Sequence, residues 1–158
     1  MIVVCDSSPL IALAIVDKLD LLDTLFNEVL VPETVFKEVT AINKLESAHI
    51  AEWAKGKVLA PTNKQLLYSY SLLLDMGEAE AMALYAEKEA DFLLIDEKKG
   101  RKIAIHNKMN VVGSLGIILM SKKKGLITKV RPLLNILQQS YIRISDELYK
   151  KTLELAEE

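Results

Sequence analysis

The chain opens with the stretch Ile2-Val3-Val4-Cys5-Asp6-Ser7-Ser8-Pro9, which reads as a buried strand followed by the start of a helix. The apolar run stops at Asp6, and Pro9 is typical of a first helical turn. A second stretch repeats the pattern, because Phe92-Leu93-Leu94-Ile95 also stops at an acid, Asp96. Such short, unbroken apolar runs are typical of parallel strands that are covered on both faces.

Helical segments separate these runs. The sequence predicts further strands at 28–31, 58–60 and 111–112, and helices at 10–16, 19–26, 45–54, 63–76, 78–90, 114–124, 127–139 and 145–156. A helix is also expected from Pro32 onward and another after Asp96, and Gly77 is expected to interrupt its segment. Alternation of strand and helix predicts an α/β fold, a three-layer α/β/α sandwich with a mainly parallel central sheet. We expect residues 1–158 to form one domain, with 127–158 as C-terminal helices.

Composition excludes several classes of protein. Apolar residues make up 51% of the 158 residues and charged residues 27%, which excludes a disordered chain. The single cysteine, Cys5, excludes an internal disulfide and fits a reducing compartment. Because no apolar run is long enough to span a bilayer and the first residues lack a basic signal-peptide region, we expect a soluble, cytoplasmic protein without membrane contact.

Charge is distributed unevenly along the chain. Residues 1–97 carry 17 acidic and 7 basic side chains, whereas residues 98–158 carry 13 basic and 5 acidic ones. Residues 98–131 hold ten Lys or Arg and no acid. This asymmetry indicates either an anionic partner or two solvated surfaces of opposite sign.

Four acids stand out by their context: Asp6, Glu38, Glu78 and Asp96. Asp6 and Asp96 end predicted strands, where parallel sheets bind ligands. Taken singly, each acid has a plainer interpretation, as a helix cap, a helix-dipole partner or a solvated side chain. Together they suit a hard cation, since one cysteine and two separated histidines exclude a zinc site of the usual kind. No phosphate-binding loop or dinucleotide fingerprint is present.

The order of these acids resembles that of the PIN-domain nucleases. The resemblance rests on Val3–Leu10, Val31–Val39, Gly77–Ala81 and Leu93–Glu97. Gly100-Arg101-Lys102 and Val112–Gly116 also resemble an uncharacterised PIN subgroup. One departure is Glu78, where many members of the family carry Asp.

The resemblance implies a ribonuclease that depends on Mg²⁺ or Mn²⁺. Asp6, Glu38 and Asp96 would hold the cation, and Glu78 would complete the acidic ring or orient the attacking water. Glu80 is the alternative to Glu78, because two residues on a helix point about 200° apart and cannot face one site. Glu97 either adds a carboxylate or only neighbours the site.

Basic residues follow the last of these acids. Lys98, Lys99, Arg101 and Lys102 are expected to bind RNA phosphates. The triplet Lys122-Lys123-Lys124 is either a second contact or a solvated helix end. Ser114 either bonds a site acid or phosphate or caps a helix.

Three functions are compatible with the sequence. The first is a metal-dependent endoribonuclease. The resemblance implies the toxin of a toxin–antitoxin pair, with an antitoxin protein as partner and a homodimer as assembly. The second is a non-catalytic RNA- or protein-binding module of the same fold. The third is a phosphotransfer domain that uses Asp6, which the lack of a second acid two residues on disfavours.

Overall fold

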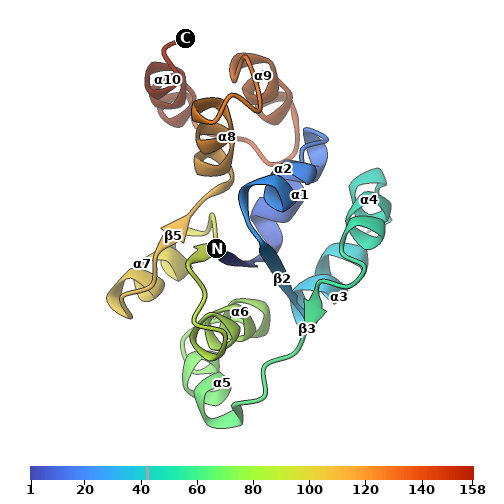
Figure 1. The fold of residues 1–158 in the computed structure, drawn as a ribbon, viewed down its shortest axis with the longest axis vertical. Coiled ribbons are helices and arrows are strands. Elements are labelled where there is room, and N and C mark those ends of the chain that lie inside the picture. The colour runs from blue at the N-terminus through green and yellow to red at the C-terminus, as the bar shows by residue number, and fades with distance from the viewer. Residues whose placement is uncertain (42) are drawn as a thin grey trace.

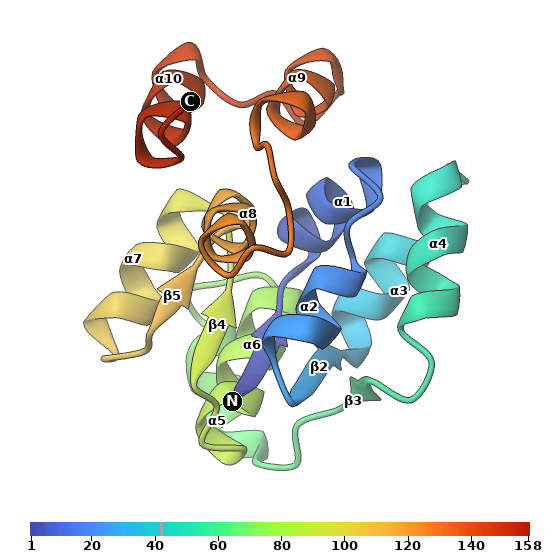
Figure 2. The same cartoon turned by 45° about the horizontal axis from the view of Figure 1, so that its top comes forward.

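The computed structural model describes residues 1–41 and 43–158 and contains one five-stranded sheet covered by helices on both faces (Figures 1 and 2). The strands are β1 (Ile2–Cys5), β2 (Glu28–Pro32), β3 (Val58–Leu59), β4 (Phe92–Leu94) and β5 (Val111–Val112). They are all parallel and lie in the order β3-β2-β1-β4-β5. The predicted α/β/α sandwich is therefore confirmed.

The helices follow the strands in the expected alternation. They are α1 (Ser7–Ile15), α2 (Asp20–Leu25), α3 (Glu33–Ala41), α4 (Leu45–Trp53), α5 (Lys64–Ser71), α6 (Met76–Glu87), α7 (Lys98–His106), α8 (Ser114–Lys123), α9 (Arg131–Gln139) and α10 (Asp146–Leu155). No helix within the described residues is long and apolar enough to cross a membrane.

Alternate residues of each strand enter two separate cores. Val3 and Cys5 lie in a cluster with α1, α2 and α8, whereas Val4 lies in a second cluster with α6 and α7. Side chains of a strand alternate between its two faces, so a strand that is apolar throughout is buried on both sides. This arrangement explains why the runs at β1 and β4 contain no polar residue.

The chain reverses its direction across the sheet between β1 and β4. From β1 it proceeds through β2 to β3, and it then returns to place β4 on the other side of β1. Cys5 pairs with Leu94, and the backbone N–H of Asp6 donates to the carbonyl oxygen of Leu94 at 2.9 Å. Ligands of parallel sheets bind at the carboxyl ends of strands at such a reversal point. Asp6 and Asp96 both follow strands that flank it.

Gly77 does not interrupt the chain as predicted. It lies in the first turn of α6, and the break falls between α5 and Asp75, the residue that caps α6. A Cβ at Gly77 would lie 3.1 Å from Oε2 of Glu38 and 3.3 Å from Cγ2 of Val35. The glycine therefore allows α3 and α6 to approach closely.

The starts of α3 and α9 lie later than predicted for reasons that involve proline. Pro32 pairs with Leu59 as the last residue of β2, so α3 begins at Glu33. Helix α9 begins at Arg131 instead of 127, because Pro132 lacks an N–H and is tolerated only in the first helical turn.

The two last helices pack at the end of the molecule beside α8, opposite α5 (Figures 1 and 2). The side chain of Glu158 joins them to α8, since its Oε2 accepts hydrogen bonds from Nζ of Lys122 at 2.8 Å and from the N–H of Val130 at 2.6 Å. These bonds hold the pKa of Glu158 at about 2. Lys122 is thus engaged within the fold.

Candidate active site

Asp6 lies at the end of β1 and is only 5% exposed. It occupies the position that precedes α1, but its side chain makes no capping hydrogen bond. Burial raises the pKa of Asp6 to about 7; the N–H of Ser7 opposes the increase, and the negative charges of Glu78, Asp75 and Glu38 add to it. The carboxylate therefore lies in a crowded acidic environment.

Glu38 reaches this environment from α3. The hydroxyl of Ser7 donates a hydrogen bond of 2.7 Å to Oε2 of Glu38. Glu38 is exposed, whereas Asp6 is buried. The acidic cluster is therefore open to solvent on the side of α3, which suits a polymeric substrate better than a small enclosed ligand.

Glu78 reaches the acidic environment of Asp6 from the first turn of α6. The N–H of Glu78 donates to Oδ1 of Asp75 at 2.9 Å, and together the two side chains form a capping box. Burial raises the pKa of Glu78, and the charge of Asp75 raises it further. A Cβ at Gly100 would lie 2.9 Å from Oε1 of Glu78, so the first turn of α7 packs directly on this carboxylate.

Glu80 is directed elsewhere. Its two carboxylate oxygens accept hydrogen bonds from the N–H of Thr34 at 2.8 Å and from the Thr34 hydroxyl at 2.9 Å. This pairing places the negative charge of Glu80 at the start of α3, where the helix dipole favours an anion. Of the two acids that the sequence left open, Glu78 is the one beside Asp6.

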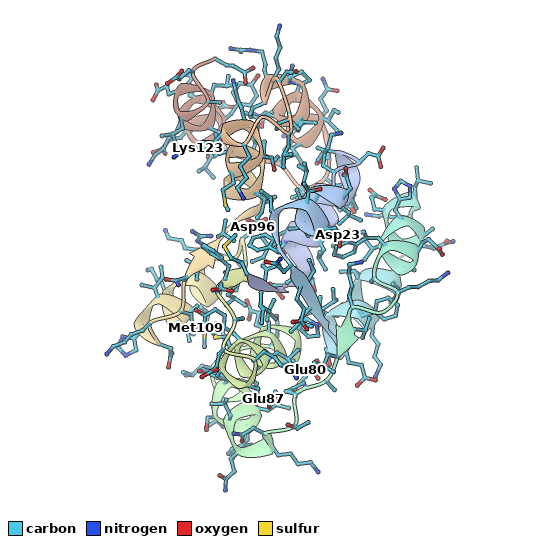
Figure 3. The ribbon with its side chains drawn as sticks, in the orientation of Figure 1. Asp23, Glu80, Glu87, Asp96, Met109 and Lys123 are labelled. Atoms are coloured by element: carbon cyan, nitrogen blue, oxygen red, sulfur yellow. The ribbon has the colours of Figure 1, made fainter. Side chains whose placement is uncertain are left out.

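Asp96 follows β4 and lies close to the start of α8 (Figure 3). Its Oδ1 accepts a hydrogen bond of 2.8 Å from the N–H of Ser114. Burial raises the pKa of Asp96, and the Ser114 hydrogen bonds and the charge of Arg101 counteract this. A Cβ at Gly113 would lie 2.6 Å from Oδ1 of Asp96, so only glycine fits there without a shift.

The capping functions around Asp96 fall on its neighbours. Glu97 caps α7, because its Oε2 accepts a hydrogen bond from the N–H of Gly100 at 2.7 Å, and this bond lowers the pKa of Glu97. Gly113 occupies the cap position of α8, and Ser114 binds Asp96 through its N–H. Asp96 therefore does not cap α7, and its side chain instead accepts from the N–H of the first residue of α8.

The four predicted basic residues lie on α7 in two different environments. Lys98, Lys99 and Lys102 are exposed, whereas Arg101 is half-buried. Lys99 lies near enough to Glu78 for its charge to oppose the increase in the pKa of Glu78. Positive charge thus borders the acidic cluster on the side of α7.

The donor set has the chemistry of a site for a hard cation. The described acids of the cluster offer only carboxylate oxygens, the ligands that Mg²⁺ and Mn²⁺ prefer. Repulsion between these carboxylates contributes to the raised pKa of Asp6, and a divalent cation would relieve it. Over residues 1–41 and 43–158, no three acids, histidines or cysteines are already close enough together to hold an ion. The residues therefore suit the cation by the chemistry of their oxygens, whereas their present arrangement does not form a complete set of ligands.

Sequence reasoning missed Asp75. This exposed acid stands three residues before Glu78, and its charge acts on both Asp6 and Glu78. The signal was available, because an Asp followed three residues later by a Glu is the pattern of a capping box. The expectation of a break at Gly77 separated the two acids.

Comparison with known proteins gives a family match. The family described as "DUF3368: PIN domain" matches residues 2–158, which is nearly the whole chain. No curated protein matches the chain.

Proposed function

Because the chain belongs to the PIN-domain family, whose members are generally nucleases, we propose that it is a divalent-metal-dependent endoribonuclease. Its reaction would be hydrolysis of RNA phosphodiester bonds at a site that joins Asp96 to the acidic neighbours Asp6, Glu38 and Glu78. The cation would be Mg²⁺ or Mn²⁺.

The observation that carries the proposal is the crowding of acids around Asp6. The pKa of this strand-end carboxyl rises to about 7, since it is buried and lies near Glu78, Asp75 and Glu38. A fold gains no stability from burying acids together, so such crowding indicates a functional site. Its place beside the reversal point of a parallel sheet supports the same conclusion.

Asp6, Glu38 and Asp96 are the residues that would hold the cation. When bound there, a divalent cation polarises a phosphate oxygen and promotes ionisation of water at neutral pH. The chain itself orients these ligands. Ser7 fixes the carboxylate of Glu38, and the N-terminus of α8 fixes Asp96 through Ser114.

Glu78 would accept the proton of the attacking water. Its pKa is raised above the ordinary value by burial and by Asp75, which brings it nearer to neutral pH. Lys98, Lys99 and Lys102 on the exposed side of α7 would bind the phosphates that flank the scissile bond. Their charges offset the repulsion between RNA and the acidic cluster.

The partners follow from the same proposal. RNA is the substrate, and the antitoxin chain and homodimer implied by the resemblance stay predictions. Among the alternatives, a non-catalytic binding module would keep the cation and the basic helix without turnover. The experiment below separates the two.

The test is a titration of Mn²⁺ and Mg²⁺ into the wild type, the Asp6→Asn/Asp96→Asn variant and the control Asp20→Asn. Degradation of a mixed RNA pool is followed together with calorimetric metal binding. We expect metal-dependent cutting by the wild type and by the control, whose exposed acid lies on α2, and none by the double variant. Metal binding without cutting would support the binding module, and cutting by the double variant would contradict the proposed site.

A further inference from the structure

Arg101 is placed unlike the lysines around it on α7. Lys98, Lys99 and Lys102 are exposed, but Arg101 is half-buried. Its guanidinium Nη1 donates a hydrogen bond of 2.8 Å to the carbonyl oxygen of Ile95. That carbonyl belongs to the peptide that leads directly into Asp96.

The guanidinium and the carboxylate of Asp96 both lie next to Gly113, although the two groups form no hydrogen bond or ion pair with each other. A Cβ at Gly113 would lie 3.2 Å from Nη1 of Arg101 and 2.6 Å from Oδ1 of Asp96, so both groups converge on the same glycine. The charge of Arg101 acts on Asp96 in the direction expected for such a neighbour, because it lowers the pKa that burial raises. Geometry and charge thus agree on the proximity.

The backbone N–H and the backbone carbonyl of Ile95 are bound by different elements. The N–H of Ile95 donates to the carbonyl oxygen of Val112 on β5 at 2.9 Å, and the carbonyl oxygen accepts from Arg101. Asp96 is then bound through Oδ1 by the N–H of Ser114. The chain on either side of the acid is therefore anchored to β5, α7 and α8.

Arginine suits this place for a chemical reason. Its planar guanidinium presents several N–H donors in a fixed arrangement, so one group can bind a carbonyl and face a carboxylate at once. A lysine carries a single ammonium on a flexible stem and is heavily hydrated. The two residue types are not interchangeable when a donor must be held in a partly buried position.

We propose that Arg101 is a positioning residue, which holds the carbonyl of Ile95 and so the chain that leads into Asp96 in place for the cation, and is not a phosphate contact like its neighbours. This inference rests on the proposed function, since it assigns Asp96 to the metal site. It separates the basic residues of α7 into two roles. The exposed lysines bind substrate, whereas Arg101 acts through Asp96.

The experiment compares Arg101→Lys and Arg101→Met with Lys102→Met, an exposed neighbour on the same helix. Three quantities are measured: calorimetric affinity for Mn²⁺ without RNA, kcat and KM for a single-stranded RNA, and the midpoint of thermal unfolding. For Arg101→Lys we expect Mn²⁺ affinity and kcat to fall about tenfold with KM unchanged. This is the effect of losing one charge-assisted hydrogen bond. For Lys102→Met we expect KM to rise and Mn²⁺ affinity to stay at the wild-type value.

Arg101→Lys keeps the charge and has the better prospect of folding, so it carries the test if Arg101→Met fails to fold. Wild-type Mn²⁺ affinity in Arg101→Lys, with only KM raised in Arg101→Met, would overturn the inference and leave the proposed function intact. Absence of Mn²⁺ binding and of cleavage in the wild type would overturn both. The two failures are therefore distinguishable.

Discussion

The hydroxyl of Ser7 donates a 2.7 Å hydrogen bond to Oε2 of Glu38, and this bond joins the first turn of α1 to α3. Ser7 directly follows Asp6 at the end of β1. Two acids that are far apart in the sequence are thereby held together by one short side chain. The bond leads to a simple prediction about cleavage.

Substitution Ser7→Ala should lower kcat about tenfold, the effect of losing one hydrogen bond to a charged group. Glu38 is exposed and would no longer be held in one orientation. Unfolding temperature should change little, since the lost bond lies at the surface. The matched control is Ser8→Ala on the same helix turn, and equal losses of kcat in both variants would contradict the assignment.

Glu78→Gln and Glu80→Gln should differ in kind, although the two acids are equally buried at 8% exposure. Glu78→Gln should lose cleavage by about a hundredfold or more, the usual contribution of a general base. Glu80→Gln should keep cleavage and lose about 1–2 kcal/mol of stability, because it weakens the bonds to Thr34 at the start of α3. Cleavage rates and chemical denaturation of both variants test this, and loss of cleavage in Glu80→Gln alone would reverse the roles.

Asp6→Asn should stabilise the metal-free protein at high pH. The pKa of Asp6 rises from 3.8 to about 7 on folding, so folding favours its protonated form. The stability that this carboxyl contributes is present below about pH 4 and is lost as the pH rises toward 7. At about 1.4 kcal/mol per pKa unit, the variant should exceed the wild type at pH 8 by a few kcal/mol and equal it near pH 4.

Denaturant unfolding of both proteins across this pH range in EDTA is the measurement. Added Mg²⁺ should stabilise the wild type and not the variant, because a cation bound only to the folded state shifts the equilibrium toward it. A wild type that is the more stable of the two at pH 8 without metal would show that Asp6 is not crowded as described.

Several of these features could be predicted from sequence because they depend on local patterns. Each of Asp6 and Asp96 closes a short apolar run, and buried parallel strands are recognisable by such runs. The preference for Glu78 over Glu80 rests on the resemblance alone, since the local pattern does not show which side of α6 packs on the sheet. Gly77 departs from the prediction for a related reason, because glycine commonly interrupts helices but here it lies within α6 and allows α3 to approach.

The contacts of Arg101 likewise could not be predicted from the sequence. Within the run from Lys98 to Lys102 it is the one arginine among four cations, but the sequence does not show which groups its guanidinium meets. Its carbonyl partner, Ile95, precedes α7. Its glycine neighbour, Gly113, lies between β5 and α8. Only the folded chain brings these three together.

Gly113→Ala should displace Asp96. The new Cβ would lie 2.6 Å from Oδ1 of Asp96, a distance that forces the carboxylate or α8 to move. The backbone of Gly113 has φ −103° and accepts an alanine, so the effect is steric and not conformational. We expect Mn²⁺ affinity and kcat to fall at least tenfold with a loss of stability of about 1–3 kcal/mol, the usual result of overpacking. Calorimetry with Mn²⁺ tests this, and unchanged affinity would show that Asp96 is not a ligand.

Removal of Lys98, Lys99 and Lys102 together should weaken RNA binding in a manner that depends on salt. Each contact between a phosphate of single-stranded RNA and a basic side chain contributes about 0.7 to the steepness of log affinity against log salt concentration. Three lost contacts should therefore reduce this slope by about 2. Fluorescence anisotropy with a labelled single-stranded RNA, in an Asp6→Asn background that prevents cutting, measures the slope. The charge-matched control replaces Lys64, Lys150 and Lys151, which are exposed on α5 and α10. Equal slopes in the two triple variants would mean that α7 attracts RNA only through net charge, whereas a smaller slope confined to the α7 variant would assign the phosphate contacts to that helix.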